Sequence, residues 1–243
     1  MGTKIIYHGS TKIIKNPEYG KGKEYDDYGR GFYCTEHLDL AKEWACSENT
    51  PGFANKYQID FDGLSILDLS ESKYTILHWL ALLVNNRKFR ISTPIMKKGV
   101  EWLTNNYLID LSNYDIVIGY RADDSYFSFA RSFLNNEISL SQLSSAMTLG
   151  KLGQQIVLIS PKAFGKIKFI SYEVTDNSIF YAKKKYRDEK ARLQYNKLLE
   201  LDVLDDLFIR DLIRLEVKDN DPRLQWDVSC WCNEMPWRSN WFC

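Results

Sequence analysis

The stretch from residue 27 to residue 45, DYGRGFYCTEHLDLAKEWA, constrains the fold of this 243-residue chain more than any other. Its first part gathers aromatic side chains around Gly29 and Gly31, and glycine permits tight bends and a close approach of the backbone to a ligand. A strand that begins at Gly31 would direct Phe32 to one face and Tyr33 to the other. The pattern predicts either one wall of a slot for a flat ligand or a hairpin of the core.

A helix is predicted directly after this strand, because apolar residues recur at steps of three and four. These residues are Leu38, Ala41, Trp44 and Ala45. Thr35 is the expected N-cap of the helix, since its hydroxyl can accept a hydrogen bond from a free backbone N–H.

Composition excludes few classes of protein. Hydrophobic residues make up 44% and charged residues 26% of the chain, and 32 basic residues balance 32 acidic ones. This balance predicts no overall electrostatic field that would attract a nucleic acid or a membrane, although a neutral chain can still carry a basic groove. No apolar run approaches the roughly 20 residues that span a bilayer, and no targeting signal is visible. The odd cysteine count of five favours reduced thiols and a cytoplasmic location.

The predicted elements indicate an α+β fold with a mainly antiparallel sheet, because strands lie at both ends of a body with helices inserted between them. Strands are expected at 4–8, 55–61, 64–69, 114–119, 155–160 and 167–173, and helices at 72–85, 94–109, 125–134, 139–148 and, in a longer helical region, 178–217. The strands at 55–61 and 64–69 are expected to form a hairpin around Asp62-Gly63.

The last stretch, 222–243, differs from the rest because it holds four of the seven tryptophans. Either it folds back on the body or it is a docking surface for another chain. Its Cys230 and Cys232, with Cys243 further on and no histidine nearby, are a weak zinc pattern, and no metal site is predicted.

Two motifs resemble elements of the ADP-ribosyltransferase superfamily, in its diphtheria-toxin and poly-ADP-ribose-polymerase branch. They are YHGS at 7–10 and GRGFY at 29–33, with Trp44 eleven residues after the tyrosine. The span 5–170 is similar to a bacterial family of uncharacterised function in that superfamily, through YHGS, DYGRGFYCT with AKEWA, DIVIGYRADD and QQIVLIS. The resemblance implies a split antiparallel β core with inserted helices in residues 1–175. Residues 176–243 would form a helical extension with a Trp-rich tail.

The resemblance implies that NAD is the substrate and that residues of the first two motifs bind it. His8 would hydrogen-bond the adenosine ribose, and the Gly9 backbone would pair with the nicotinamide carboxamide. Tyr33 would stack on the nicotinamide, with Trp44 closing the other side, and Arg30 would meet the pyrophosphate. The full expected set is His8, Gly9, Ser10, Arg30, Gly31, Phe32, Tyr33 and Trp44. The alternatives are a strand-end histidine, a buried helix face for Trp44 and a solvated arginine.

One departure from the branch concerns catalysis. The branch places a glutamate on a late strand, where this chain has Gln154 and Gln155, and Gln155 is the expected counterpart. Glutamine can hydrogen-bond a ribose, but it cannot act as a base. Asp123 and Asp124 are the candidates for the missing carboxylate, with capping of the helix at 125–134 as the alternative. The expected catalytic set is Tyr28, Tyr33, Asp123, Asp124 and Gln155, with Tyr28 as a second ring.

The expected function is a NAD-dependent mono-ADP-ribosyltransferase toxin that acts on a macromolecule inside a bacterial cell, in a toxin–antitoxin or phage-defence system. A nucleic-acid acceptor, RNA in particular, is favoured because a nucleobase amine brings its own nucleophile. The alternatives are a protein acceptor, a module that binds or hydrolyses NAD without such an acceptor, and a non-enzymatic interaction protein. An antitoxin or a chaperone is the expected partner, with the Trp-rich tail as its docking surface.

Overall fold

The computed structural model describes residues 2–149, 153–201, 205–219 and 221–224. The strands are β1 (Thr3–Ser10), β2 (Phe32–Cys34), β3 (Gly52–Asp60), β4 (Ile66–Asp68), β5 (Ile116–Tyr120), β6 (Gln154–Leu158) and β7 (Ile167–Thr175). The helices are α1 (Leu38–Ala45), α2 (Ile76–Asn86), α3 (Pro94–Asn106), α4 (Asp124–Leu134), α5 (Leu140–Ala146), α6 (Pro161–Phe164), α7 (Asn177–Leu199) and α8 (Ile209–Arg214). Short 3₁₀ turns lie at Leu111–Asn113 and Pro222–Leu224.

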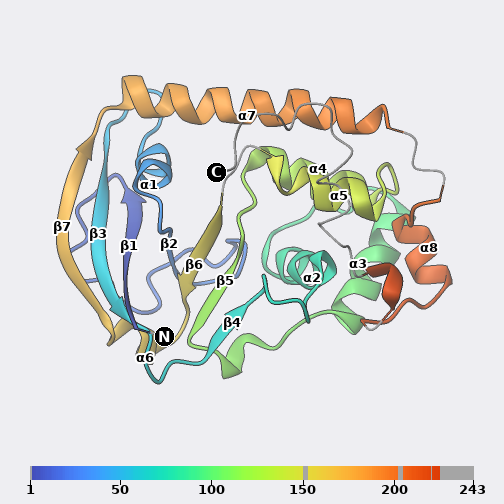
Figure 1. The fold of residues 1–243 in the computed structure, drawn as a ribbon, viewed down its shortest axis with the longest axis horizontal. Helices are drawn as coiled ribbons and strands as arrows, with labels where there is room; N and C mark the ends of the chain where they lie inside the picture. Colours follow the sequence, from blue (N-terminus) through green and yellow to red (C-terminus); the bar gives the residue numbers. More distant parts are fainter. Residues whose placement is uncertain (1, 150–152, 202–204, 220, 225–243) are drawn as a thin grey trace, which may run out of the picture.

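The strands form two sheets, which confirms the predicted α+β class. One sheet has the order β1-β3-β7 and is antiparallel, and the other has the order β2-β6-β5-β4. In the second sheet only β4 and β5 pair in parallel. Backbone hydrogen bonds between Tyr7 and Thr35, with N–O distances of 2.8 and 2.9 Å, join β1 to the residue that follows β2. The two motif-bearing strands are therefore neighbours (Figure 1).

The predicted hairpin between residues 55–61 and 64–69 is wrong. The chain does turn at Gly63, which has a φ of +75°, but β3 and β4 then enter different sheets. β3 lies between β1 and β7, so both of its edges are already paired and none is left for β4. The local turn pattern specified a change of direction and not the partner of the strand.

The helix after β2 begins later than predicted, at Leu38, with His37 in the N-cap position and no side-chain cap. Thr35 is instead fully buried in the bridge to Tyr7, and its Oγ1 accepts a hydrogen bond from the His37 N–H at 3.2 Å. The buried face also differs from the predicted one, since Leu40, Ala41, Glu43 and Ala45 are buried while Trp44 is only half-buried. This face includes a charged residue because α7 packs on it.

Helix α7 runs along one side of the molecule and contacts α1, α4 and α5 (Figure 1). Its Arg187 donates to the buried Glu43 of α1 through Nη2 and Nε, at 2.6 and 3.0 Å. The predicted boundary between residues 175 and 176 stays a prediction. The predicted Trp-rich tail lies outside the described residues from residue 225 onward. This part contains Trp226, Trp231, Trp237 and Trp241, and the three cysteines Cys230, Cys232 and Cys243.

Two hydrophobic cores hold the elements. The larger one joins α2–α5 to β4, β5 and β6, and the smaller one fills the space between the two sheets around Phe32, Tyr57 and Ile118. Helix α5 begins with a capping box of Ser139 and Gln142, and α3 begins with Thr93 as its N-cap followed by Pro94. The two sheets and α1 thus fix the positions of the motif residues.

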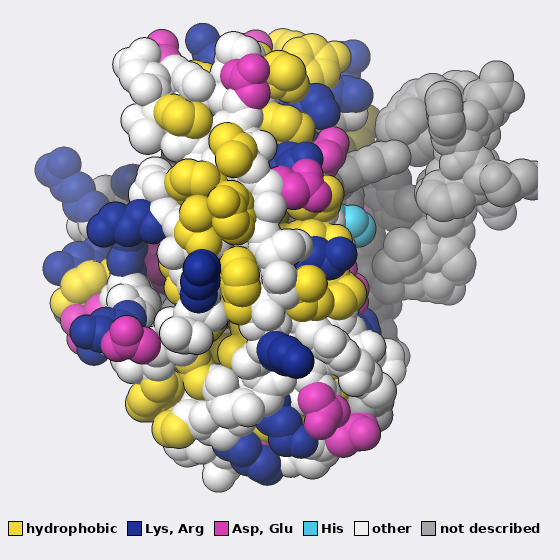
Figure 2. Space-filling model, turned by 90° about the vertical axis from the view of Figure 1, so that its left-hand side faces the viewer, with side chains coloured by type: hydrophobic (Ala, Val, Ile, Leu, Met, Phe, Trp, Pro, Cys, Tyr) yellow, Lys and Arg dark blue, Asp and Glu magenta, His cyan; other side chains and the backbone are white. Residues whose placement is uncertain are grey.

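The outer side of the β1-β3-β7 sheet carries exposed apolar side chains (Figure 2). On β7 they are Ile170, Tyr172 and Val174, which are 44%, 43% and 69% exposed. Among the described residues, no helix combines the length and the apolarity needed to cross a bilayer.

Candidate functional site

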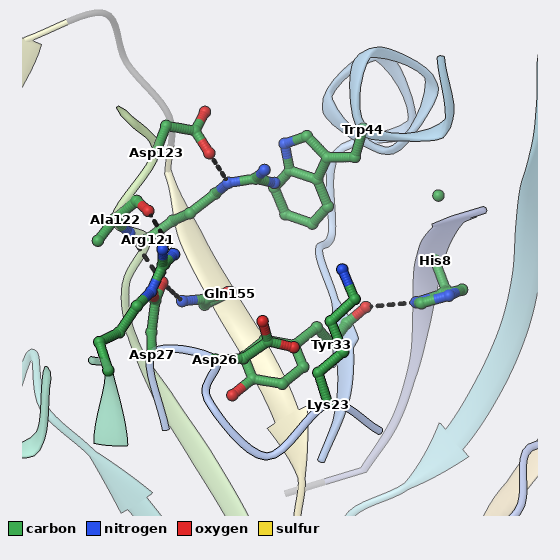
Figure 3. Close-up of a pocket in the computed structure, with 12 residues that line it drawn as sticks. His8, Lys23, Asp26, Asp27, Tyr33, Trp44, Arg121, Ala122, Asp123 and Gln155 are labelled. Carbon is green, nitrogen blue, oxygen red and sulfur yellow. Dashed lines mark hydrogen bonds and ion pairs between the residues drawn. The ribbon is translucent and has the colours of Figure 1, made fainter. Parts of the chain in front are cut away.

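A cavity of about 270 Å³ brings the four motif segments together (Figure 3). The residues that line it are His8 and Gly9 from β1, Lys23, Asp26 and Asp27 from the loop before β2, Tyr33 from β2, Trp44 from α1, Arg87 after α2, Arg121, Ala122 and Asp123 after β5, and Gln155 from β6. Of the expected NAD-binding and catalytic residues, His8, Gly9, Tyr33, Trp44, Asp123 and Gln155 meet here. Their convergence makes this cavity the candidate site.

His8 is held in one orientation and one tautomer. Its Nδ1 lies 2.7 Å from the backbone oxygen of Tyr33, and a carbonyl oxygen can only accept, so Nδ1 carries the proton. The ring stacks on Phe32 with centroids 4.3 Å apart. Burial lowers the pKa of His8, against the opposing effect of its bond to Tyr33, so the ring is neutral at pH 7. His8 therefore presents Nε2 as a hydrogen-bond acceptor.

Gly9 is fixed by the packing of α1 against β1. A Cβ added there would lie 2.1 Å from the Ala41 backbone oxygen and 2.8 Å from the Ala45 backbone nitrogen. Glycine is therefore required for the helix that carries Trp44 to approach the strand that carries His8.

The Tyr33 hydroxyl is fully used by the backbone. It donates to the Gly29 carbonyl at 2.6 Å and accepts from the Tyr28 N–H at 3.0 Å. Burial raises the pKa of Tyr33 well above its ordinary value, so the phenol stays neutral. The ring of Tyr33 can contact a ligand, but its hydroxyl is in no position to act as an acid, a base or a nucleophile.

Trp44 lies across the cavity from Tyr33, and Arg121 covers its ring (Figure 3). The Arg121 guanidinium carbon lies 3.7 Å from the centroid of the indole, which is a cation–π arrangement. The same guanidinium is ion-paired with Asp123 through Nε. Nε1 of Trp44 is buried and has no acceptor among the described residues. A ligand ring that stacks on this face must first displace Arg121.

Gln155 is oriented by a buried carboxylate. Its Nε2 donates to Asp27 Oδ2 at 2.9 Å and to the Tyr120 backbone oxygen at 3.1 Å, which uses both of its amide hydrogens. Oε1 is therefore the atom left to accept a hydrogen bond, and no described residue donates to it. Gln155 lines the cavity as an acceptor for a hydroxyl group.

Asp27 and Asp26 are site residues that the sequence-based interpretation missed. Asp27 is 4% exposed, and its oxygens accept from Arg87 Nε at 2.7 Å, the Ala122 N–H at 2.9 Å and Gln155. Asp26 is half-buried, and no described residue donates a hydrogen bond to its carboxylate. Burial raises the pKa of Asp26, while Lys23 opposes that rise. The signal in the sequence that could have indicated these two residues is the pair of adjacent aspartates shortly before GRG at 29–31.

Several expected site residues lie away from the cavity. The ring of Tyr28 is buried, and its hydroxyl donates to the Tyr120 backbone oxygen at 2.8 Å. Arg30 is exposed and lies 3.8 Å from Glu24. Phe32 supports His8 from the core side.

The remaining expected residues either have a role in the structure of the backbone or have side chains outside the described part of the chain. A Cβ on Gly31 would lie 2.6 Å from Val157 Cγ1, so this glycine serves the close pairing of β2 with β6. The hydroxyl of Ser10 accepts a hydrogen bond from the Lys12 N–H at 3.2 Å. Asp124 is the first residue of α4, and its side chain lies outside the described part. Asp123 is the N-cap residue of α4 but makes no side-chain capping bond.

Within the described ranges, no group of three or more histidine, cysteine or carboxylate side chains is placed to hold a metal ion. Cys34 and Cys46 are buried free thiols.

Comparison with known proteins gives one match. The model of a family described as protein of unknown function, DUF3990, matches residues 4–169, a range that contains every residue lining the cavity. No curated protein matches the chain, and no solved structure does so either.

Proposed function

The chain belongs to the DUF3990 family of proteins of unknown function, and we propose that it is a NAD-dependent mono-ADP-ribosyltransferase that modifies a macromolecule inside the cell. The observation that carries this proposal is the arrangement of His8 and Tyr33. A neutral imidazole with a free acceptor nitrogen and a tyrosine ring with an immobilised hydroxyl meet in one cavity beside a glycine backbone. Neither side chain is set up for nucleophilic catalysis, whereas both suit the binding of a ribose and a planar ring.

The size of the cavity supports binding of one end of the dinucleotide. Ligand pockets commonly enclose about 300–1,000 Å³, and about 270 Å³ here suits a nicotinamide ring with its ribose. The pyrophosphate would then lie at the rim. Lys23 and Arg121 line the same cavity and supply positive charge for phosphate oxygens.

The proposed reaction breaks the bond between nicotinamide and ribose. Its transition state carries positive charge on the sugar, and the nicotinamide leaves as a neutral ring. An enzyme accelerates such a step by stabilising the charged sugar more than the bound substrate. The Gln155 oxygen is an acceptor for a ribose hydroxyl, and the negative charge of Asp26 and Asp27 in the same cavity favours the cationic sugar.

For the acceptor we propose a nucleic acid, RNA in particular, because a nucleobase amine is nucleophilic without a strong base. A protein acceptor is the second candidate. Hydrolysis of NAD without a macromolecular acceptor is the third, in which water takes the place of the nucleophile.

The experiment that tests the proposal uses NAD with a radiolabelled phosphate, the purified chain and a bacterial cell extract. The product is divided, and one part is treated with protease and the other with nuclease before counting. Label that resists protease and is lost with nuclease supports a nucleic-acid acceptor, and the opposite result supports a protein. Free nicotinamide without labelled polymer indicates hydrolysis.

Two tyrosine variants serve as the matched pair. Tyr33→Ala removes the ring from the cavity, whereas Tyr172→Ala removes a 43% exposed ring on β7. The proposal requires loss of labelling in the first variant and full labelling in the second. If the wild-type chain neither binds NAD nor releases nicotinamide, the proposal is wrong.

We propose further that an antitoxin or a chaperone binds the Trp-rich stretch, residues 222–243. Deletion of residues 225–243 should then abolish neutralisation by the product of a neighbouring gene. Neutralisation that survives the deletion would place the partner elsewhere.

A further inference from the structure

We propose that Asp26 supplies the catalytic carboxylate that Gln155 lacks, and that it accepts the proton of the attacking nucleophile. This inference rests on the proposed function and names the group that performs its proton transfer.

Three carboxylates line the cavity, those of Asp26, Asp27 and Asp123. Asp27 accepts hydrogen bonds from Arg87, the Ala122 N–H and Gln155 on its two oxygens. Asp123 is ion-paired with Arg121. A carboxylate already bound by a guanidinium is a weak base, because the cation favours its charged form.

Asp26 differs from both of them. None of the described residues donates a hydrogen bond to its side chain or forms an ion pair with it. It is also close enough to the Tyr33 ring for its charge to affect the Tyr33 pKa. In Figure 3 the Asp26 carboxylate lies on the same side of the cavity as Tyr33, across from Trp44 and Arg121. Asp26 is thus a carboxylate with no partner in the described part of the chain, and it lines the same cavity as the ring that would hold nicotinamide.

The surroundings of Asp26 also suit a base. Burial raises the pKa of Asp26, and the negative charge of Asp27 acts in the same direction. Together they outweigh the positive charges of Lys23, Arg87 and Arg121, which lower that pKa. A higher pKa makes a carboxylate a better proton acceptor near neutral pH. Half-burial leaves Asp26 accessible to an acceptor group that enters from solvent.

In the proposed step one bond forms, one breaks and one proton is released. The nucleophile of the acceptor, a nitrogen or an oxygen, forms a bond to the ribose C1′ with its lone pair. The glycosidic bond to nicotinamide breaks, and its electron pair neutralises the positive ring, which leaves. The proton of the nucleophile moves to a carboxylate oxygen of Asp26 and from there to water. The products are the ADP-ribosylated acceptor, nicotinamide and one proton.

The test uses Asp26→Asn, which keeps the shape of the side chain and removes the base. We expect turnover at saturating NAD to fall by about 10²–10⁴-fold, the usual contribution of a general base. NAD binding should stay within about threefold, because the amide fills the same space. The thermal midpoint should stay equal or rise, since burial already disfavours the charged carboxylate.

The pH profile adds a readout that a structural role would not produce. Wild-type turnover should rise with pH through the raised pKa of Asp26 and then level off, and this limb should be absent in Asp26→Asn. Asp205→Asn, an exposed residue between α7 and α8, is the matched control and should behave as the wild type.

The outcomes separate the inference from the function. If Asp26→Asn keeps turnover within tenfold of the wild type, or loses NAD binding together with turnover, the inference is wrong and the transferase proposal stands. If Asp123→Asn loses turnover while Asp26→Asn does not, Asp123 is the base. A wild-type chain that binds no NAD ends both proposals.

Discussion

Replacement of Asp27 tests the hydrogen-bonded centre on which the site is built. This carboxylate is 4% exposed, and Arg87 donates to its Oδ1 through Nε at 2.7 Å, with Nη2 at an ion-pair distance of 2.7 Å from the same oxygen. The Ala122 N–H and Gln155 Nε2 donate to Oδ2, both at 2.9 Å. In Asp27→Asn one of these two sides must face an amide NH₂ instead of an oxygen, so at least one donor loses its acceptor.

The size of the effect follows from these contacts. Hydrogen bonds to charged groups contribute about 1.5–3 kcal/mol each, and a buried donor without an acceptor costs about 1–3 kcal/mol. Breaking a fully buried ion pair costs about 3–5 kcal/mol, but the Arg87 side chain is 30% exposed, so solvent compensates part of that loss. We expect the free energy of unfolding to fall by about 2–4 kcal/mol, or roughly 5–15 °C in the thermal midpoint.

The assay is urea unfolding followed by circular dichroism, with an unchanged m-value as the condition for comparing free energies. Asp39→Asn removes an exposed carboxylate that lies 3.2 Å from Lys183 and should cost less than about 1 kcal/mol. Combining Asp27→Asn with Arg87→Met should cost less than the sum of the single changes, because both remove the same ion pair. A loss below about 1 kcal/mol in Asp27→Asn, or full additivity in the double variant, would refute this reasoning.

Three further predictions concern His8, Tyr33 and α7. NAD affinity should stay constant down to the ordinary histidine pKa of 6.5 and weaken only at lower pH, since burial lowers the pKa of His8 and keeps Nε2 unprotonated; titrations across pH measure this, and a loss already above pH 6.5 would contradict it. Tyr33→Phe should lower the free energy of unfolding by about 1–3 kcal/mol through the unpaired Gly29 carbonyl, yet bind NAD within a few-fold, as calorimetry can check. Arg187→Met should lower the free energy of unfolding by about 2–4 kcal/mol, because it leaves the 2% exposed Glu43 without its ion-pair partner. An unchanged melting curve would mean that this pair does not hold α7 to α1.

The sequence predicted most elements but not their partners. Strands and helices occur close to the expected ranges, because apolar periodicity and caps such as Ser139 with Gln142 act over a few residues. The hairpin at Asp62-Gly63 failed because strand pairing depends on which edges remain free. Glu43 inside a buried helix face was equally hidden, since its partner Arg187 is 144 residues away.

The candidate site divides in the same way. The resemblance of the motifs to ADP-ribosyltransferase elements led to the prediction that His8, Gly9, Tyr33, Trp44, Asp123 and Gln155 are site residues, and all six line the cavity. Asp26 and Asp27 were passed over, and Tyr28 was assigned a ring position that its burial does not allow. Adjacent residues of a loop diverge in ways that spacing does not encode.

The sequence by itself therefore determined the α+β class and the motifs that form the cavity. It also showed that a glutamine, Gln155, stands where the resemblance leads one to expect a glutamate. Only the tertiary structure decided which of the three carboxylates that line the cavity have partners among the described residues and which one has none. The difference has a physical reason: periodicity and capping are local properties of the chain, whereas the state of a carboxylate depends on the charges and donors around it. Around Asp27 those donors come from Arg87, Ala122 and Gln155, which are distant in sequence. Because these three groups bind Asp27, Asp26 lines the cavity without a partner among the described residues.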